Sequence, residues 1–188
     1  MDNITNVKIV ECDESMYLKP ARMLYEQNGI KKSWDLMRIH DSVGIIIFNV
    51  TREVLLFVKQ FRPGMTIELC AGIVDKVQSL AETARDEILE ECGYSVPLTS
   101  LQRVTSYRSG VGVTGSNQTL FYVEVTDSMK VSQGGGNNYE GEYIEVIEMD
   151  LEQAYSLIYD EKVPRPASLM LALMWFFRNK TSRIVQKL

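Results

Sequence analysis

Three glutamates, Glu87, Glu90 and Glu91, have the residue type and spacing that most directly point to chemistry. On a helix that turns about 100° per residue they share one face, and Ile88 and Cys92 lie on a neighbouring apolar face. Three like charges this close destabilise an ordinary helix, whereas a bound divalent cation reverses that effect. Two interpretations are open: a solvated acidic face, which is the commoner case for a glutamate-rich helix, and a metal site.

The helix that must carry these glutamates has clear boundaries in the sequence. Ser79 followed by Glu82 is a capping-box pattern, so a helix is predicted to start directly after the serine. Gly93 predicts the helix end, because glycine readily takes the left-handed conformation of a C-terminal cap. Residues 66–71 are expected to form a short strand that leads to Gly72 and the loop before the helix.

Residues 42–50 and 53–61 predict the centre of a sheet. Both runs are apolar on both faces, so we expect them to be covered on both sides. Further strands are expected at 101–107, 118–126 and 143–149, and further helices at 151–159 and 167–178. Arg62 follows the second central strand and is either a surface charge or a group that binds phosphate through two hydrogen bonds.

Residues 1–40 are predicted to form a small antiparallel sheet, separate from the main domain at 41–188. Asn28 and Gly29 form a hairpin-turn pair between two weakly alternating segments. This sheet has too little core of its own, so we expect it to pack on the main domain or on a second subunit. Trp34 is either a packing residue or an aromatic platform for a nucleotide base, and the residues alone favour neither.

Two loops have compositions that suit ligand binding. Residues 108–117 contain Gly112 and Gly115, and their backbone amides could wrap a ligand, although the same composition suits a flexible connection. Residues 132–142 are glycine-rich and end in Glu140 and Glu142. Such a loop is more often simply solvated, but it would also suit a mobile lid that carries a general base.

The composition limits the class of function. With 188 residues and 45% hydrophobic content, the chain suits one globular domain. A net charge of −5 and a pI near 5.0 argue against a nucleic-acid-binding protein. The three cysteines have neither paired nor zinc-like spacing, which predicts reduced thiols in a cytoplasmic protein. We find no signal-peptide pattern, and no apolar run reaches the ~20 residues of a membrane span.

The acidic segment resembles the Nudix box, G-x5-E-x7-R-E-U-x-E-E-x-G-U, in which U is a bulky apolar residue. Its positions are occupied here by Gly72, Glu87, Ile88, Glu90, Glu91, Gly93 and Tyr94. Two positions depart from the pattern, because Gln78 replaces the usual Glu and Asp86 the usual Arg, with Arg85 next to it. Together with the KQFRP, ELCAGIVD and SGVGVTGS segments, almost the whole chain resembles the animal UDP-sugar (UDP-glucose) pyrophosphatases within the ADP-ribose pyrophosphatase group.

This resemblance implies an α/β/α Nudix sandwich, with a mixed central sheet and a small N-terminal antiparallel sheet that helps to form a homodimer. It implies Mg²⁺-dependent hydrolysis of UDP-glucose to UMP and glucose 1-phosphate, with Mn²⁺ as an alternative ion. ADP-ribose or another nucleoside diphosphate sugar is the alternative substrate. A Nudix-fold protein that binds a nucleotide without cleaving it is the alternative from another class.

The resemblance also implies roles for individual residues. The metal ligands would be the side chains of Glu87, Glu90 and Glu91, which is also counted as catalytic, and the backbone carbonyl of Ala71. Arg62 would bind the diphosphate, Trp34 would stack on the base, and Glu142 would be the general base, with Glu140 as the second candidate. The departures at Gln78 and Asp86 are expected to weaken one metal position without preventing the site from assembling.

Overall fold

The structure is a computed structural model that describes residues 4–10, 12, 15, 18–137 and 141–181. Its strands are β1 (Lys19–Gln27), β2 (Ile30–Arg38), β3 (Ser42–Asn49), β4 (Val54–Arg62), β5 (Gly64–Glu68), β6 (Cys70–Ile73), β7 (Gln102–Ser109), β8 (Ser116–Val125) and β9 (Ile144–Asp150). Its α-helices are α1 (Leu80–Cys92), α2 (Leu151–Leu157) and α3 (Ala167–Asn179), with short 3₁₀ turns at Leu98–Ser100 and Asp127–Met129.

The central sheet has seven strands and is mixed, as expected. Its main path runs in the order β5-β4-β3-β8-β7, while β6 pairs with β3 and β9 pairs with β4. The pairing of β3 with β8 is parallel and the other pairings are antiparallel. Strand β3 is buried over most of its length, which confirms the prediction from its two apolar faces.

The predicted single strand at residues 66–71 is two strands in the structure. Strand β5 pairs with β4, β6 pairs with β3, and Leu69 lies between them. The registers show that the chain runs along β4 toward the Ile47–Leu56 pair, reverses at Leu69, and returns along β3. The two central strands therefore diverge at this end of the sheet, and the chain enters the loop before α1 from the gap between them.

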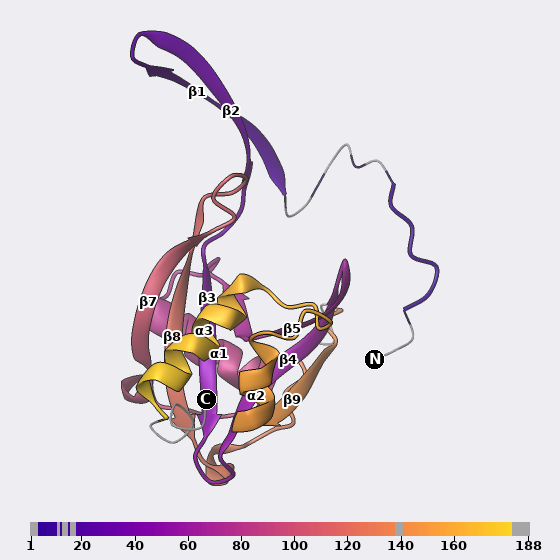
Figure 1. Cartoon of the computed structure of the whole chain (residues 1–188), viewed down its shortest axis with the longest axis vertical. Helices are drawn as coiled ribbons and strands as arrows, with labels where there is room; N and C mark the ends of the chain where they lie inside the picture. Colours follow the sequence, from indigo (N-terminus) through magenta and orange to yellow (C-terminus); the bar gives the residue numbers. More distant parts are fainter. Residues whose placement is uncertain (1–3, 11, 13–14, 16–17, 138–140, 182–188) are drawn as a thin grey trace.

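Helices cover both faces of the sheet, which gives the expected α/β/α sandwich (Figure 1). Alternate residues of β3 point to opposite faces. Val43, Ile45 and Ile47 pack in one core with Ala84 and Ile88 of α1. Ile46 belongs to the other core, with the buried faces of α2 and α3. Among the described residues, no helix is long and apolar enough to cross a membrane.

The hairpin of β1 and β2 extends away from the body of the molecule (Figure 1). It forms a separate two-stranded sheet, paired from Lys19 with Arg38 to Gln27 with Ile30. Most of its side chains are exposed, so it packs little on the main domain of the same chain, and packing on a second subunit stays a prediction. Its contact with the body is at its base, where the Met37 N–H donates to the Val113 carbonyl at 2.8 Å.

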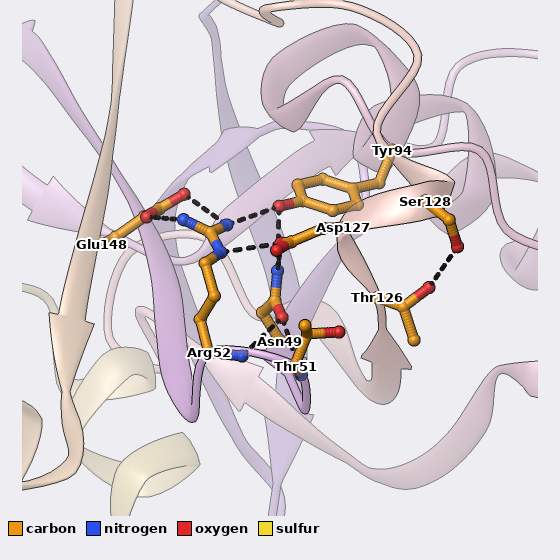
Figure 2. Close-up of polar contacts among 8 residues, drawn as sticks. All are labelled: Asn49, Thr51, Arg52, Tyr94, Thr126, Asp127, Ser128 and Glu148. Carbon is orange, nitrogen blue, oxygen red and sulfur yellow. Dashed lines mark hydrogen bonds and ion pairs between the residues drawn. The ribbon is translucent and has the colours of Figure 1, made fainter.

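A polar cluster around Arg52 links the turn between β3 and β4 to the residue that follows the end of α1 (Figure 2). The Arg52 guanidinium pairs with Asp127 and Glu148 and donates to the hydroxyl of Tyr94 at 2.9 Å. Tyr94 is fully buried and directly follows the helix cap, at the last position of the box. Asn49, also fully buried, donates to the same hydroxyl at 3.2 Å. We call these five residues the Arg52 cluster.

Candidate active site

Helix α1 places its three glutamates at different depths. Glu91 is only 5% exposed, Glu87 is half-buried and Glu90 is exposed. Both predicted helix ends are confirmed: Ser79 forms the capping box, and Gly93 caps the C-terminus with φ of 77°. The acidic face thus extends from solvent into the protein, which the charge pattern alone did not indicate for Glu91.

Glu91 joins α1 to strand β6. Its Oε2 atom accepts a hydrogen bond from the backbone N–H of Ala71 at 3.0 Å. Cys70 and Cys92, the neighbours of these two residues, are both fully buried in the core on the α1 side. The carboxylate is therefore held next to the backbone segment that contains the predicted carbonyl ligand.

Gly72 provides the space in which the Glu87 side chain lies. A Cβ atom built on Gly72 would be 1.9 Å from Oε1 of Glu87 and 2.0 Å from its Cδ. Any other residue at this position must displace the carboxylate, because real Cβ atoms do not approach another atom so closely. The first glycine of the box is thus explained by close approach.

The glycines at residues 134–136 attach the following loop to the end of α1. The N–H of Gly135 donates to the carbonyl of Glu91 at 2.9 Å, which pairs one of the helix-end carbonyls. A Cβ on Gly134 would lie 2.3 Å from that same carbonyl oxygen. Gly134 also has φ of 70°, so both space and backbone conformation require glycine there.

This loop carries Glu142 to the acidic cluster. The N–H of Asn137 donates to Oε2 of Glu142 at 3.4 Å, and the N–H of Glu142 donates to the Asn137 carbonyl at 3.1 Å. The charge of Glu142 raises the pKa values of Glu87 and Glu91, so the three carboxylates are within electrostatic reach. Glu140, the second candidate base, lies outside the described residues.

Burial and the neighbouring negative charges raise the pKa values of Glu87 and Glu91. Burial is the main cause that raises the pKa of Glu91 from 4.5 to about 8, partly opposed by the hydrogen bond from Ala71. Burial, followed by the charges of Glu90 and Glu142, raises the pKa of Glu87 to about 7. A region that gathers this much negative charge is suited to binding a cation.

The donor set fits a hard divalent cation. Across the described parts of the chain, no three His, Cys, Asp or Glu side chains already converge on one ion position. However, Glu87, Glu90 and Glu91 offer carboxylate oxygens, which Mg²⁺ prefers, and the Ala71 carbonyl is adjacent. A cation would relieve the repulsion that raises the pKa of Glu87, so binding would draw these groups together.

The two departures from the box are in contact with each other. Nε2 of Gln78 donates to Oδ2 of Asp86 at 3.4 Å and to Oγ1 of Thr83 at 3.2 Å. Arg85 pairs with the other oxygen of Asp86 at 2.7 Å. The positive charge of Arg85 is therefore engaged by Asp86 and does not point to the glutamates. An amide–carboxylate contact occupies the two positions where the box has an opposite-charge pair.

Arg62 lies at the end of β4, with its side chain 58% exposed, and its Nε is 3.6 Å from Oε1 of Glu68. Glu68, whose side chain is only 17% exposed, was not among the site residues predicted from the sequence. Its carboxylate also accepts from the hydroxyl of Thr66 at 2.5 Å. A charged residue between the apolar Ile67 and Leu69 was the available signal.

Trp34 and the predicted glycine loop meet at the base of the hairpin. Nε1 of Trp34 donates to the carbonyl of Gly112 at 3.1 Å, and its side chain remains half-exposed. The amide of Gly115 is directed at the carbonyl of Gly110, as are those of Val113 and Thr114. These three amides are thus engaged within the loop, and the loop receives Trp34 through the carbonyl of Gly112. A role of Gly112 and Gly115 in substrate binding stays a prediction.

Comparison with known proteins identifies the family. The NUDIX domain family matches residues 38–171. The chain belongs to the Nudix family. It is a Nudix hydrolase, and enzymes of this kind use divalent metal ions.

Relatives of this Nudix chain include pyrophosphatases named for two different sugar nucleotides. It is 42% identical to the uridine diphosphate glucose pyrophosphatase NUDT14 of Bos taurus, across 94% of this chain and 96% of that protein. The protein of the same name from Mus musculus is 41% identical over the same shares. A GDP-mannose pyrophosphatase of Pectobacterium atrosepticum is 31% identical across 70% of each chain.

The raised carboxyl pKa values of this Nudix hydrolase predict pH-dependent stability without metal. Folding raises the pKa of Glu91 from 4.5 to about 8, so this group stabilises the fold below pH 4.5 and loses that contribution as pH rises to 8. Glu87 also stabilises the fold at low pH, and this contribution is lost as the pH rises to its pKa of about 7. Mg²⁺ binds the ionised carboxylates, so it should raise the melting temperature more at pH 8 than at pH 5.5.

Thermal unfolding with and without Mg²⁺ at both pH values measures this difference. The same scans on Glu91→Gln are the control, because the variant lacks the group with the larger shift. An equal effect of Mg²⁺ at both pH values in the unmodified protein would contradict the prediction.

Proposed function

We propose that this enzyme hydrolyses the diphosphate of UDP-glucose to UMP and glucose 1-phosphate, with Mg²⁺ as its ion and Mn²⁺ as a substitute. The observation that carries the proposal is the set of carboxylates around Gly72 and Ala71, which suits a metal-assisted attack on an anionic diphosphate. The substrate assignment is supported by the two mammalian relatives, which are named uridine diphosphate glucose pyrophosphatases.

In this proposal the site residues hold the ion, bind the diphosphate and accept a proton. When bound, the divalent ion neutralises the diphosphate and lowers the pKa of the attacking water. Glu87, Glu90 and Glu91, with the Ala71 carbonyl, hold the ion in this proposal. Arg62 binds the non-bridging oxygens, oriented by Glu68. Glu142 receives the proton of the water, because it lies at the open side of the cluster on a loop fixed to α1.

Two alternatives remain distinct from this proposal. ADP-ribose or another nucleoside diphosphate sugar would use the same mechanism, and GDP-mannose is the sugar nucleotide named in the bacterial relatives. A nucleotide-binding protein without catalysis would be expected to lack the terminal carboxylates of the box. All three of these carboxylates are present here.

Product analysis tests the function directly. The purified protein is incubated with Mg²⁺ and, separately, with UDP-glucose, GDP-mannose, ADP-ribose and a nucleoside triphosphate, and the products are separated by chromatography. We expect UMP and glucose 1-phosphate from UDP-glucose at the highest kcat/KM. Preference for another sugar nucleotide would overturn the substrate but not the mechanism, and cleavage of none would favour the binding protein.

Glu142→Gln is expected to lower kcat about a hundredfold with little change in KM. The amide cannot accept the proton, but it retains the size of the side chain and an oxygen to accept from Asn137. Steady-state kinetics with UDP-glucose measure both constants. An unchanged kcat would show that another group, such as Glu140, accepts the proton.

We further propose a cytoplasmic homodimer in which the N-terminal unit, residues 1–40, packs on a second copy of the 41–188 domain. A two-stranded hairpin alone is marginally stable in water, and Leu24 and Ile30 of this hairpin are 77% and 62% exposed. Residues 19–38 carry five Lys or Arg and two Asp or Glu, so this segment is +3 while the rest of the chain is −8. The hairpin therefore complements the charge of another copy.

Light scattering after size exclusion tests the dimer. The unmodified protein should have twice the chain mass of 21.4 kDa, and Leu24→Glu should shift it to the monomer because the charge cannot be buried. Glu26→Gln, on an exposed position of the same strand, is the control and should remain dimeric. A monomeric unmodified protein at micromolar concentration would refute this arrangement.

A further inference from the structure

A cavity of about 560 Å³ lies between the edge of β5 and β6, strand β7 and the start of α3. Its lining combines charged, amide, hydroxyl and apolar side chains, among them Glu68, Leu69, Arg108, Gln118, Ser168 and Leu171. We propose that this cavity, here named the hexose pocket, binds the sugar of the nucleoside diphosphate sugar. This inference rests on the proposed function and adds to it the place where the sugar is recognised.

The position of the pocket relative to the glutamates is set by Ala71. This residue lines the pocket, and its N–H donates to Glu91. In this proposal, a substrate whose diphosphate lies at the glutamates extends its sugar end past Ala71 into the cavity. Glu68 makes a second connection, because it lines the pocket and also lies 3.6 Å from Arg62.

The chemistry of the lining favours a sugar over a uracil ring. Hexose hydroxyls donate hydrogen bonds, and the carboxylate of Glu68 only accepts them when ionised. The Watson–Crick edge of uracil presents two carbonyl oxygens beside a single N–H, and these oxygens would face that carboxylate. Leu69 and Leu171 supply an apolar wall that suits the C–H face of a pyranose ring.

Gln118 gives the pocket a fixed polar wall. Its Nε2 donates to the hydroxyl of Ser42 at 3.1 Å, and its Oε1 accepts from the hydroxyl of Tyr107. A Cβ on Gly44 would approach the Gln118 amide to 3.7 Å, so the side chain rests against the backbone of β3. Because both the nitrogen and the oxygen of the Gln118 amide are hydrogen-bonded, the side chain can distinguish hydroxyl positions without losing conformational entropy when the ligand binds.

The base of the nucleotide would bind outside the hexose pocket, at Trp34. Trp34 does not line the pocket, and its indole is fixed to the loop carbonyl of Gly112. Arg108 lines the pocket while bonding to the Gly115 carbonyl of the same loop. The loop between β7 and β8 therefore separates a sugar side from an aromatic side, with the diphosphate at the glutamates.

A bulky substitution at Leu171 tests the assignment. Leu171 is on α3 and is 40% exposed, so Leu171→Trp can fill the pocket without disturbing the core. The kinetics are compared with UDP-glucose and with the methyl ester of UDP, which keeps the nucleotide and diphosphate but has no hexose. We expect kcat/KM to fall about tenfold or more for UDP-glucose and less than about threefold for the ester.

Met174→Trp is the matched control. This residue is one turn further along α3, is 55% exposed and does not line the pocket. The control should leave both substrates within about twofold of the unmodified enzyme. An equal loss for both substrates with Leu171→Trp, or no loss for either, would overturn the hexose pocket.

Equilibrium binding separates this inference from the hydrolytic function. Calorimetry is performed on Glu142→Gln, with and without Leu171→Trp, using UDP-glucose and the methyl ester. Selective weakening of UDP-glucose binding supports the pocket even if the unmodified protein cleaves no sugar nucleotide, in which case only the proposed function fails. Equal binding changes for the two ligands refute the pocket, whether or not the enzyme is active.

Discussion

Glu91→Gln is expected to reduce kcat about a thousandfold while the protein remains folded. Glu91 is the most buried of the three glutamates and lies against Ala71, so it is the proposed metal ligand with the most fixed position. Glutamine keeps the shape and an oxygen that accepts from the Ala71 N–H, but it lacks the charge that a cation requires. Steady-state turnover of UDP-glucose at saturating Mg²⁺ measures the loss, and circular dichroism verifies the fold.

Glu152→Gln provides the control for this change. Glu152 is exposed in the first turn of α2, and the same loss of charge there should leave turnover unchanged. If Glu91→Gln retained turnover at ordinary Mg²⁺ concentrations, the assignment of Glu91 as a metal ligand would be wrong. Recovery of activity only at much higher Mg²⁺ would instead place the defect in ion affinity.

Gly72→Ala is expected to lower kcat/KM about a hundredfold with only a small change in melting temperature. The added Cβ would lie 1.9 Å from Oε1 of Glu87, so one of the two groups must move. The carboxylate is the end of a flexible side chain, so it can move at low cost to folding. It would then leave the position from which we propose that it binds the ion.

A double-variant cycle separates this explanation from general damage. In a protein that already carries Glu87→Ala, the clash at Gly72 no longer exists. Adding Gly72→Ala should therefore cost little further activity, and the two effects should be strongly non-additive. Additive losses would indicate that Gly72 acts on the site through the strand and not through Glu87.

Helix α1 could be predicted from local signals. Ser79, Glu82 and Gly93 define both ends through interactions within a few residues, and the structure reproduces both caps. The two-sided burial of the central strands also followed from their apolar pattern. These features depend on residues close together in the sequence.

Features that depend on which distant strands or helices a segment contacts could not be predicted in the same way. The segment around Leu69 reads as one strand, and only the pairing of each half with a different partner reveals the reversal. The same applies to Glu68, whose role depends on a cavity that α3 completes from a hundred residues away. The internal bonding of the glycine loop at Gly115 depends on turn geometry that composition does not encode.

The Arg52 cluster has a consequence for the rate at which the fold is lost. The hydrogen bonds of its Arg52 guanidinium join residues separated by 42 to 96 positions, from Tyr94 to Glu148. Such contacts require the sheet and the end of α1 to be assembled first, so they form late in folding. Interactions absent from the folding transition state mainly slow unfolding. We therefore expect the guanidinium of Arg52 to slow unfolding, which prolongs the lifetime of the folded enzyme without accelerating its formation.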